Sequence, residues 1–326
     1  MRALVVSDNL ASQVNGVAIT LNKIQELAKV FMPDYAELRL LTPDSFRNIS
    51  AYGYPEVKLT IQPLKVFREI SSYKPTHIHI ATEGPLGLLT RLYCSKKGWK
   101  FTTSYHTQFP MFLEKMYGIP SGITWKYLRW FHSKAENTLV PTESIRLQLR
   151  DQKFDGSLVL WSRGVDKAQF ISNKKPVKNR VLYVGRVSKE KNLEDLCALG
   201  SKYDIHIVGD GPERKILEQK YSEVNFVGYK KGQELADEYA SAEVFCFPSR
   251  SDTFGIVLIE SLALGTPVAA YPVPGPRDIV EVNKTGYLSN NLEEAIEKCK
   301  ALGRVSGPEW SWEKCYSTFM ESLTHV

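Results

Sequence analysis

Residues 244–271 read VFCFPSRSDTFGIVLIESLALGTPVAAY, with a helix-like stretch between two short apolar runs. The runs Val244–Phe247 and Val268–Tyr271 are rich in β-branched and aromatic residues, which favours buried strands. The stretch between them follows a turn-forming sequence, Ser-Asp-Thr-Phe-Gly, and is apolar. A strand, a helix and a second strand in this order are typical of a βαβ unit with parallel strands.

The same alternation extends on both sides of this unit. We predict further strands at residues 3–7, 38–41, 57–61, 77–80, 101–104, 138–140 and 158–161, and then at 181–184, 205–208 and 225–227. The polar, proline-containing segment 172–179 is typical of a linker. The sequence therefore predicts an α/β chain of two doubly wound, Rossmann-like domains, residues 1–170 and 171–309, that face each other across a cleft and bind ligands beyond the carboxyl ends of their strands.

The last segment, residues 310–326, is expected to form a helix that crosses back to the first domain. Trp312, Tyr316, Phe319 and Leu323 recur at helical spacing, which favours one apolar face packed against the body of the protein.

The composition fits a folded chain of this organisation. It has 326 residues, and single hydrophobic cores stop growing at roughly 250–300 residues. The five cysteines are scattered without Cys-x-x-Cys spacing, which indicates reduced thiols in a cytoplasmic compartment. Residues 1–170 hold 22 basic and 14 acidic side chains, so the net charge of +6 arises in the first domain. The basic residues form no recognisable nucleic-acid-binding module, and we expect no nucleic-acid partner.

No segment is expected to span a membrane. The apolar run before Asp8 is too short for a secretory signal. The stretch between Asp252 and Arg277 is poor in charge, but Glu260 lies inside it, and a carboxylate at the centre of a spanning helix costs about 2.5–3.5 kcal/mol. The stretch is therefore not a membrane span, and Glu260 needs another explanation.

Cations and glycines follow two predicted strands of the second domain. Arg186 and Lys191 lie between a strand end and a helix start, where two cations oppose the helix dipole unless an anion such as a diphosphate lies between them. A solvated charged loop is the alternative. Gly185, Gly209 and Gly211 allow the backbone to approach a phosphate, or serve only the turn. The chain has no P-loop and no complete Gly-x-Gly-x-x-Gly motif, which disfavours nucleotide hydrolysis and dinucleotide oxidoreduction.

Two carboxylates bracket the helix start in the stretch quoted first. Asp252 precedes the turn, and Glu260 lies within the helix whose first amides, at Phe254, Gly255 and Ile256, can hold anionic oxygens. In the alternative, Asp252 is a helix cap and Glu260 a surface residue, but the apolar flanks make an unpaired Glu260 costly.

As an ordered set, these motifs resemble the retaining glycosyltransferases of family 4, which have the GT-B fold, and in particular their mannosyltransferase-like subgroup. The resemblance is carried by the Asn15-Gly16 loop, Ser104-Tyr105-His106-Thr107, Ser162-Arg163-Gly164-Val165-Asp166, Gly185-Arg186 with Lys191-Asn192, Gly209-Asp210-Gly211-Pro212, and the acidic pair Asp252 and Glu260. It implies a hexosyltransferase that moves a sugar from a nucleotide diphosphate sugar to an acceptor.

The resemblance also implies roles for individual residues. Arg186 and Lys191 hold the donor diphosphate, Asp252 contacts hydroxyls of the donor sugar, and His106 lies near the transferred sugar; these four form the implied catalytic set. Glu260 binds the ribose. The remaining implied contacts are made on the donor side by Gly16, the backbone near Tyr229, Thr253, and the amides of Phe254, Gly255 and Ile256, and on the acceptor side by Asn15, Tyr105 and Arg163.

One residue departs from the family pattern. Most members have Glu at the position of Asp252, and the shorter side chain shifts the contacts to the sugar. Similarity to mannosyl and sulfoquinovosyl transferases favours GDP-mannose as donor, with UDP-glucose or another UDP-sugar as the alternative. No Asp-x-Asp occurs, so we expect no metal and no other cofactor, with Arg186 and Lys191 stabilising the leaving group. Rival interpretations are a non-catalytic sugar-nucleotide-binding protein and a phosphate-releasing or epimerising enzyme.

The acceptor cannot be read from the sequence and is a glycan, a lipid-linked or a protein-linked molecule. The segment 111–132 mixes aromatic and basic residues at helical spacing. Such a segment is typical of a peripheral membrane contact, of a core stripe with solvated cations, or of a homo-oligomer contact.

Overall fold

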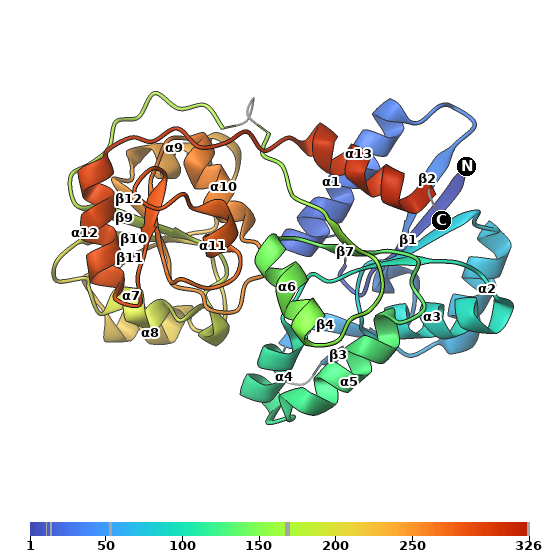
Figure 1. Ribbon diagram of the computed structural model, residues 1–326. Coiled ribbons are helices and arrows are strands. Elements are labelled where there is room, and N and C mark those ends of the chain that lie inside the picture. The colour runs from blue at the N-terminus through green and yellow to red at the C-terminus, as the bar shows by residue number, and fades with distance from the viewer. Residues whose placement is uncertain (11, 14, 52–53, 167–169, 325–326) are drawn as a thin grey trace. The chain divides into compact units, whose positions relative to one another are not determined.

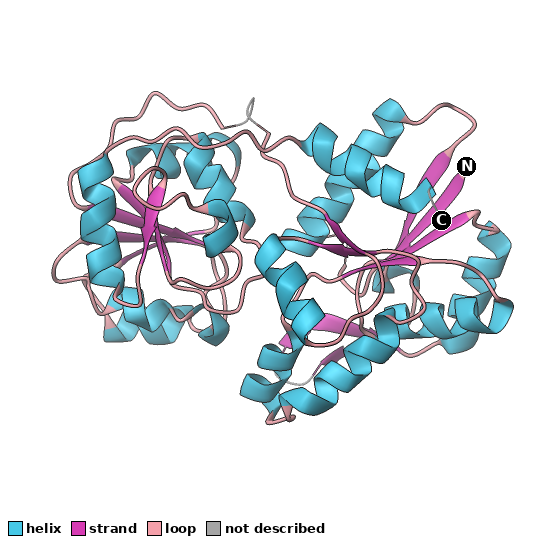
Figure 2. Cartoon of the chain, viewed as in Figure 1, coloured by secondary structure: helices cyan, strands magenta, loops and turns pink. Residues whose placement is uncertain are grey.

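The chain folds into two compact units in the computed structural model, which describes residues 1–10, 12–13, 15–51, 54–166 and 170–324 (Figure 1). Unit 1 comprises Met1–Arg163 and Trp312–Val326, and unit 2 comprises Gly164–Ser311. The described residues form one six-stranded sheet in each unit and one separate two-stranded sheet. Paired strands run parallel in both large sheets, and Figure 2 shows helices on both faces of each. The predicted pair of Rossmann-like domains is confirmed.

The sheet of unit 1 has the order β2-β1-β5-β6-β7-β8. Its strands are β1 (Arg2–Val6), β2 (Glu37–Leu41), β5 (His77–Ile80), β6 (Thr102–Ser104), β7 (Thr138–Val140) and β8 (Leu158–Leu160). Its helices are α1 (Gly16–Phe31), the short η1 (Pro43–Ser45), α2 (Pro63–Tyr73), α3 (Pro85–Lys97), α4 (Phe109–Tyr117), α5 (Ser121–His132), α6 (Glu143–Asp151) and α13 (Trp312–Thr324).

Strand β1 shows why this sheet is covered on both sides. Its residues alternate between the two faces, as the pleat of a strand requires. Ala3 and Val5 pack in one core with α1 and α13, whereas Leu4 and Val6 pack in another with α2 and α3. A strand that is buried on both faces contains a continuous run of apolar residues, and this run allowed β1 to be predicted from the sequence.

The strand predicted at residues 57–61 is present, but its expected place in the parallel sheet is wrong. It lies in β4 (Tyr54–Thr60), which pairs antiparallel with β3 (Asn48–Ala51) outside the main sheet. A short apolar run indicates a strand but carries no information on its partner. The strand β3, rich in polar residues, gave no apolar signal.

The sheet of unit 2 has the order β11-β10-β9-β12-β13-β14. Its strands are β9 (Arg180–Val184), β10 (Asp204–Val208), β11 (Asn225–Gly228), β12 (Val244–Phe247), β13 (Val268–Ala270) and β14 (Gly286–Leu288). Its helices are η2 (Lys189–Lys191), α7 (Leu193–Cys197), α8 (Arg214–Lys220), α9 (Gly232–Ser241), α10 (Ile256–Ala263), α11 (Pro276–Ile279) and α12 (Leu292–Leu302). The three-residue β14 was not predicted.

The chain passes into unit 2 after Arg163, earlier than the division after residue 170 that the sequence suggested. Val165 packs in the core of unit 2, and its amide donates to the Trp310 carbonyl at 3.0 Å. The predicted linker lies along α9: the Ser172 hydroxyl donates to Asp237 at 2.6 Å, and the Val177 amide donates to the Ser241 carbonyl at 2.9 Å. The segment 172–179 is therefore held by unit 2.

The C-terminal helix α13 belongs to unit 1. Trp312, Tyr316, Phe319 and Leu323 are buried, as their spacing predicts, and pack in the core that contains α1. The Trp161 indole donates to the Cys315 carbonyl at 2.9 Å, which ties the chain after β8 to this helix. All five cysteines are buried and free of disulfides.

Candidate functional site

Unit 2 brings Lys191 and Asp252 together at the carboxyl edge of its sheet. Lys191 ends η2, which follows β9, and Asp252 follows the neighbouring strand β12. The Lys191 Nζ donates to Asp252 Oδ1 at 2.7 Å and Oδ2 at 2.8 Å. The two side chains are 21% and 24% exposed. The cation and the carboxylate that were expected to contact different parts of one ligand therefore pair with each other, within reach of solvent.

Arg186 lies at the same edge, directly after the turn that ends β9. Its carbonyl accepts a hydrogen bond from the buried Tyr183 hydroxyl at 3.0 Å, and its side chain is half-buried. The following turn is fastened to the Asp252 loop, because the Ser251 hydroxyl donates to the Glu190 carbonyl at 3.5 Å. These contacts place the predicted diphosphate-binding residues on one stretch of backbone.

The glycines of this edge serve backbone packing. A Cβ on Gly209, where φ is 136°, would lie 1.9 Å from the Gly185 carbonyl oxygen. A Cβ on Gly211 would lie 2.2 Å from the Val187 carbonyl oxygen. The two strand-end turns touch backbone to backbone, which requires glycine at both positions. Of the two interpretations drawn from the sequence, the turn itself accounts for Gly209 and Gly211.

Glu260 has the polar partner that its apolar surroundings demand. It lies in α10, and its Oε2 accepts a hydrogen bond from the Tyr239 hydroxyl on α9 at 2.8 Å. Burial raises the pKa of Glu260 to about 7, while the hydrogen bond from Tyr239 lowers it. Tyr239 is fully buried and was not predicted, since nothing in the sequence of α9 distinguishes it from an ordinary core aromatic.

Helix α10 begins without a capping side chain. Its cap residue is Gly255, with φ at 88°, a left-handed conformation that favours glycine. A Cβ on Gly275 would lie 2.8 Å from the Phe254 carbonyl oxygen, so that glycine lets the chain before α10 pack closely. The side chains of Thr253 and Phe254 are buried, and Phe254 packs edge-on against Trp310. A contact to a donor at residues 254–256 would use backbone amides.

Tyr229 also lies at this edge, immediately after β11. Its side chain is 57% exposed. The preceding residue, Gly228, accepts a hydrogen bond from the Gly209 amide at 2.9 Å, so the Tyr229 backbone is next to the paired glycine turns. The donor-side residues predicted in the second domain therefore share one edge of one sheet.

The carboxyl edge of unit 1 holds His106, which follows β6, and Arg163, which follows β8. The Arg163 Nη2 donates to His106 Nδ1 at 2.9 Å. Both side chains are buried. Burial, followed by the charge of Arg163, holds the pKa of His106 well below its usual value. Arg163 was predicted to contact the acceptor, and the structure gives it His106 as a partner.

The side chain of Tyr105 lies in the core, and the contact of Tyr105 to an acceptor stays a prediction. Its side chain is fully buried in the cluster that includes Leu128 and Val140, and its ring stacks on Trp125. Neighbouring residues in an extended segment face opposite sides, so His106 and Tyr105 do not point into the same space.

Asn15 and Gly16 begin helix α1. The Asn15 Oδ1 accepts hydrogen bonds from the amides of Val17 at 3.1 Å and Ala18 at 2.9 Å, which makes Asn15 the helix cap. Its side-chain amide donates to Asn9 and Gln13. Both predicted residues thus lie at the carboxyl edge of unit 1 after β1, where Asn15 organises the loop.

Asp8 is a further polar residue of this edge that the sequence did not single out. Its carboxylate accepts from the amides of Leu86 at 2.7 Å and Gly87 at 3.2 Å and from the Thr82 hydroxyl at 2.7 Å. Burial raises the pKa of Asp8 to about 6. Asp8 therefore caps α3 from a neighbouring strand. One feature of the sequence could have indicated this role: α3 begins at Gly84-Pro85, where glycine offers no capping side chain and another residue must supply the cap.

Two family models match the chain. The model described as glycosyl transferases group 1 covers residues 165–302, and the model described as glycosyltransferase family 4 covers residues 29–169. A GDP-mannose-dependent alpha-mannosyltransferase from Mycobacterium tuberculosis is 30% identical over 88% of this chain and 83% of the relative. This chain belongs to the family 4 glycosyltransferases.

The glycosyltransferase is also similar to the sulfoquinovosyl transferase SQD2 of Arabidopsis thaliana, with 31% identity over 77% of this chain and 54% of the relative. It thus spans about half the length of that protein. Among solved structures, Anabaena Alr3699/HepE in complex with UDP and glucose matches with a TM-score of 0.75 and 16% identity, and the match covers 100% of both chains. At this identity the match shows the fold alone, and the predicted GT-B fold is confirmed.

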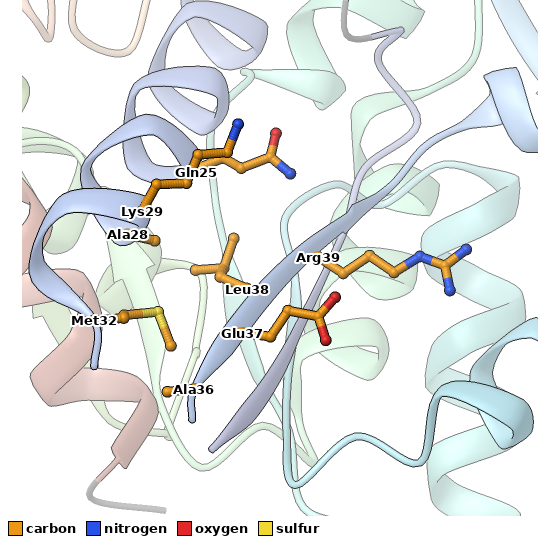
Figure 3. Close-up of a pocket in the computed structure, with 8 residues that line it drawn as sticks. All are labelled: Gln25, Ala28, Lys29, Met32, Ala36, Glu37, Leu38 and Arg39. Atoms are coloured by element: carbon orange, nitrogen blue, oxygen red, sulfur yellow. The ribbon is translucent and has the colours of Figure 1, made fainter. Parts of the chain in front are cut away.

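The groove shown in Figure 3 lies away from the predicted site residues of the glycosyltransferase. It has a volume of about 300 Å³ between α1 and the first half of β2, with Gln25 and Lys29 on one side and Glu37 and Arg39 on the other. In parallel sheets of this kind, ligands bind at the carboxyl ends of the strands. The groove is not at that edge.

Within the described ranges, no cluster of three or more His, Cys, Asp or Glu side chains could hold a metal ion. Metal independence stays a prediction. In the same part of the chain, no helix is both long and apolar enough to cross a bilayer.

Proposed function

We propose that the glycosyltransferase transfers mannose from GDP-mannose to a glycan, lipid-linked or protein-linked acceptor, with retention of anomeric configuration and without a metal. The proposal rests on the Lys191–Asp252 pair beside the start of α10, which offers one charge for a diphosphate and one acceptor for sugar hydroxyls. The choice of GDP-mannose follows the similarity to the GDP-mannose-dependent alpha-mannosyltransferase of Mycobacterium tuberculosis.

Donor binding would exchange the partners of this pair. The diphosphate takes Lys191 and Arg186, and the sugar hydroxyls donate to the Asp252 carboxylate in place of the Lys191 ammonium. Because both side chains are only partly exposed, an unpaired Asp252 carboxylate would lose more solvation than a surface group does. A donor that carries both a diphosphate and sugar hydroxyls satisfies both halves of the pair at once.

Glu260 would accept hydrogen bonds from the ribose hydroxyls. With its pKa at about 7, the carboxyl group is partly protonated at neutral pH, and a diol that donates to it favours the ionised form. The Tyr239 hydroxyl remains on Oε2 and fixes the orientation of the carboxylate.

The chemical step breaks the bond between the anomeric carbon and the phosphate oxygen. The acceptor hydroxyl bonds to the same face of that carbon, and its proton passes to an oxygen of the departing diphosphate. Arg186, Lys191 and the first amides of α10 stabilise the charge that develops on the leaving group. Same-face displacement needs no carboxylate nucleophile.

The test supplies GDP-mannose, UDP-glucose and UDP-N-acetylglucosamine, each labelled in the sugar, together with lipid and glycan fractions as acceptors. We expect incorporation of label from GDP-mannose, and an α-configured product by NMR. Incorporation from a UDP-sugar alone would replace the donor assignment, and a β-configured product would remove retention. Free or epimerised sugar formed without acceptor would favour the rival enzyme classes.

The helices α4 and α5 support a peripheral membrane contact as part of this proposal. Leu128 and Phe131 are buried, so the core explanation holds for one face of the segment. Met111, Tyr117 and Ile123 are between 41% and 60% exposed. The neighbouring side chains of Lys115 and Lys126 are also exposed, and the combination favours anionic lipid. Flotation with liposomes that contain anionic lipid tests this contact, and no binding at low salt would eliminate it.

A further inference from the structure

The strongest unexplained feature of unit 1 is the fixation of Arg163. Its Nη1 donates to the carbonyls of Trp161 at 2.6 Å and Ser162 at 2.9 Å, and its Nη2 donates to His106 Nδ1 at 2.9 Å. The guanidinium also lies 4.3 Å from the centroid of the Trp161 ring. The residue as a whole is 5% exposed. These contacts hold the guanidinium from several sides within one buried site.

Trp161 is itself fixed by the C-terminal helix. Its indole donates to the Cys315 carbonyl on α13, and its ring packs 5.3 Å from the ring of Phe319. The rings of Trp161 and His106 lie 5.6 Å apart. Helix α13 therefore holds in place the Trp161 ring, against which both Arg163 and His106 pack.

The hydrogen bond between Arg163 and His106 allows one state of the imidazole. A guanidinium has only donors, so the nitrogen that it contacts must present a lone pair. A neutral imidazole with a lone pair on Nδ1 carries its proton on Nε2. Protonation of Nδ1 would place two N–H groups and two positive charges against each other inside the protein.

The surroundings of His106 favour the neutral ring further. Burial lowers its pKa most, and the charge of Arg163 lowers it further. A charge on His79 would act in the same direction, but burial lowers the pKa of His79 itself to about 3. Asp8 and Glu83, carboxyl groups that follow neighbouring strands of this sheet, are engaged elsewhere: Asp8 caps α3, and Glu83 accepts from His132 at 3.3 Å.

We propose that Arg163 is a positioning residue that fixes His106 in the Nε2–H tautomer, so that His106 acts as a hydrogen-bond donor to an oxygen of the transferred sugar. In this state His106 is neither a general base nor a general acid. The sugar contact rests on the proposed function, whereas the tautomer is a property of unit 1 alone and can be measured without any substrate.

The first test reads the tautomer in the full chain. Nitrogen NMR of ¹⁵N-histidine-labelled protein distinguishes protonated from unprotonated ring nitrogens, and the His106→Gln variant identifies the signals of His106. We expect an unprotonated Nδ1 and a protonated Nε2 across the range from pH 6 to 8. A protonated Nδ1 in the wild-type chain would overturn the proposal, whether or not GDP-mannose is the donor.

The second test compares Arg163→Lys with Arg163→Met. Lysine is also a donor without an acceptor and should preserve the tautomer and most of the activity. Methionine removes the donor, so both tautomers become populated, and kcat should fall about tenfold, the effect of one hydrogen bond, with little change in KM. Arg146→Met, which alters a partly exposed arginine paired with Glu143, is the matched control.

The pH dependence separates positioning from a general structural defect. In Arg163→Met, protonation of His106 restores an Nε2–H, so the ratio of variant to wild-type kcat should rise as the pH is lowered toward the pKa of His106, which burial still holds below its usual value. A ratio that falls as the pH is lowered, or equal defects in the lysine and methionine variants, would overturn the proposal. If the methionine variant does not fold, the spectra of the wild-type and lysine chains still decide the question.

Discussion

Each unit has a pair of interacting side chains at the carboxyl edge of its sheet, and the two pairs differ in charge and in exposure. In unit 2, Lys191 and Asp252 are opposite charges, each more than a fifth exposed. In unit 1, Arg163 and His106 are 5% and 9% exposed, and the arginine is held further by two carbonyls and a ring. A partly exposed ion pair gains little from its own contact and can exchange partners, whereas a buried hydrogen-bonded group is costly to move. Lys191 and Asp252 are therefore suited to separate and bind a ligand. Arg163 is suited to keep the His106 side chain in one position.

Lys191→Ala breaks the exchangeable pair and should have the largest effect. Removal of a cation aimed at developing leaving-group charge is expected to lower turnover about 10²–10³-fold. The fold should survive, because Lys191 is partly exposed. Transfer rates measured with labelled donor check this, alongside circular dichroism. Lys202→Ala, which removes a lysine paired with Glu293 on the surface, is the control. Equal transfer rates in the two variants would remove the diphosphate assignment.

Glu260→Gln removes a buried carboxylate of unit 2 but keeps an oxygen that can accept the hydrogen bond from the Tyr239 hydroxyl. The pKa of Glu260 is raised from 4.5 to about 7, so the native state retains a proton that the unfolded chain has lost. This contribution to stability is present below pH 4.5 and is lost as the pH rises to about 7. The variant should therefore match the wild type near pH 4.5 and exceed it at pH 8, by about 1–3 kcal/mol.

Chemical denaturation of both chains at the two pH values measures this difference. A variant that is less stable than the wild type at pH 8 would show that Glu260 is ionised in a favourable environment. Ribose binding should be weakened in the same variant, because a neutral amide is a weaker acceptor than a carboxylate.

Asp252→Asn should have the smallest effect on nucleotide binding, and in the opposite direction. Without the competing carboxylate, Lys191 is available to the diphosphate, and GDP should bind up to about fivefold more tightly, the value of an exposed ion pair. Sugar transfer should nevertheless fall, since the hydroxyls lose an acceptor. Calorimetry with GDP, compared with the wild type, checks this. Weaker GDP binding in the variant would contradict the exchange of partners.

The sequence predicted the sheets better than the contacts at their edges. Strands such as β1 could be recognised locally, because residues 3–6 of this strand are all apolar and both of its faces are buried. The pairing of β3 with β4 could not, since partners depend on residues distant in the chain. The family resemblance located Lys191 and Asp252, but their direct ion pair requires β9 and β12 to be neighbours.

The sequence was least informative about residues whose roles depend on contacts with distant parts of the chain. Tyr239 has the appearance of any core aromatic until Glu260 is placed beside it. Tyr105 follows a strand as a site residue would, yet its side chain is the one that faces the core. Asp8 caps a helix that begins far along the sequence. Each of these depends on a neighbouring element, which a periodic pattern does not identify.

Calorimetric titration of GDP-mannose into the wild-type chain, Lys191→Ala and Asp252→Asn tests whether the donor exchanges the partners of the Lys191–Asp252 pair. We expect GDP-mannose to bind to the wild type in preference to UDP-glucose and UDP-N-acetylglucosamine. The affinity for GDP-mannose should be lowered in both variants, although the affinity for GDP should be lowered only in Lys191→Ala. Absence of GDP-mannose binding, or equal binding to all three chains, would contradict this proposal.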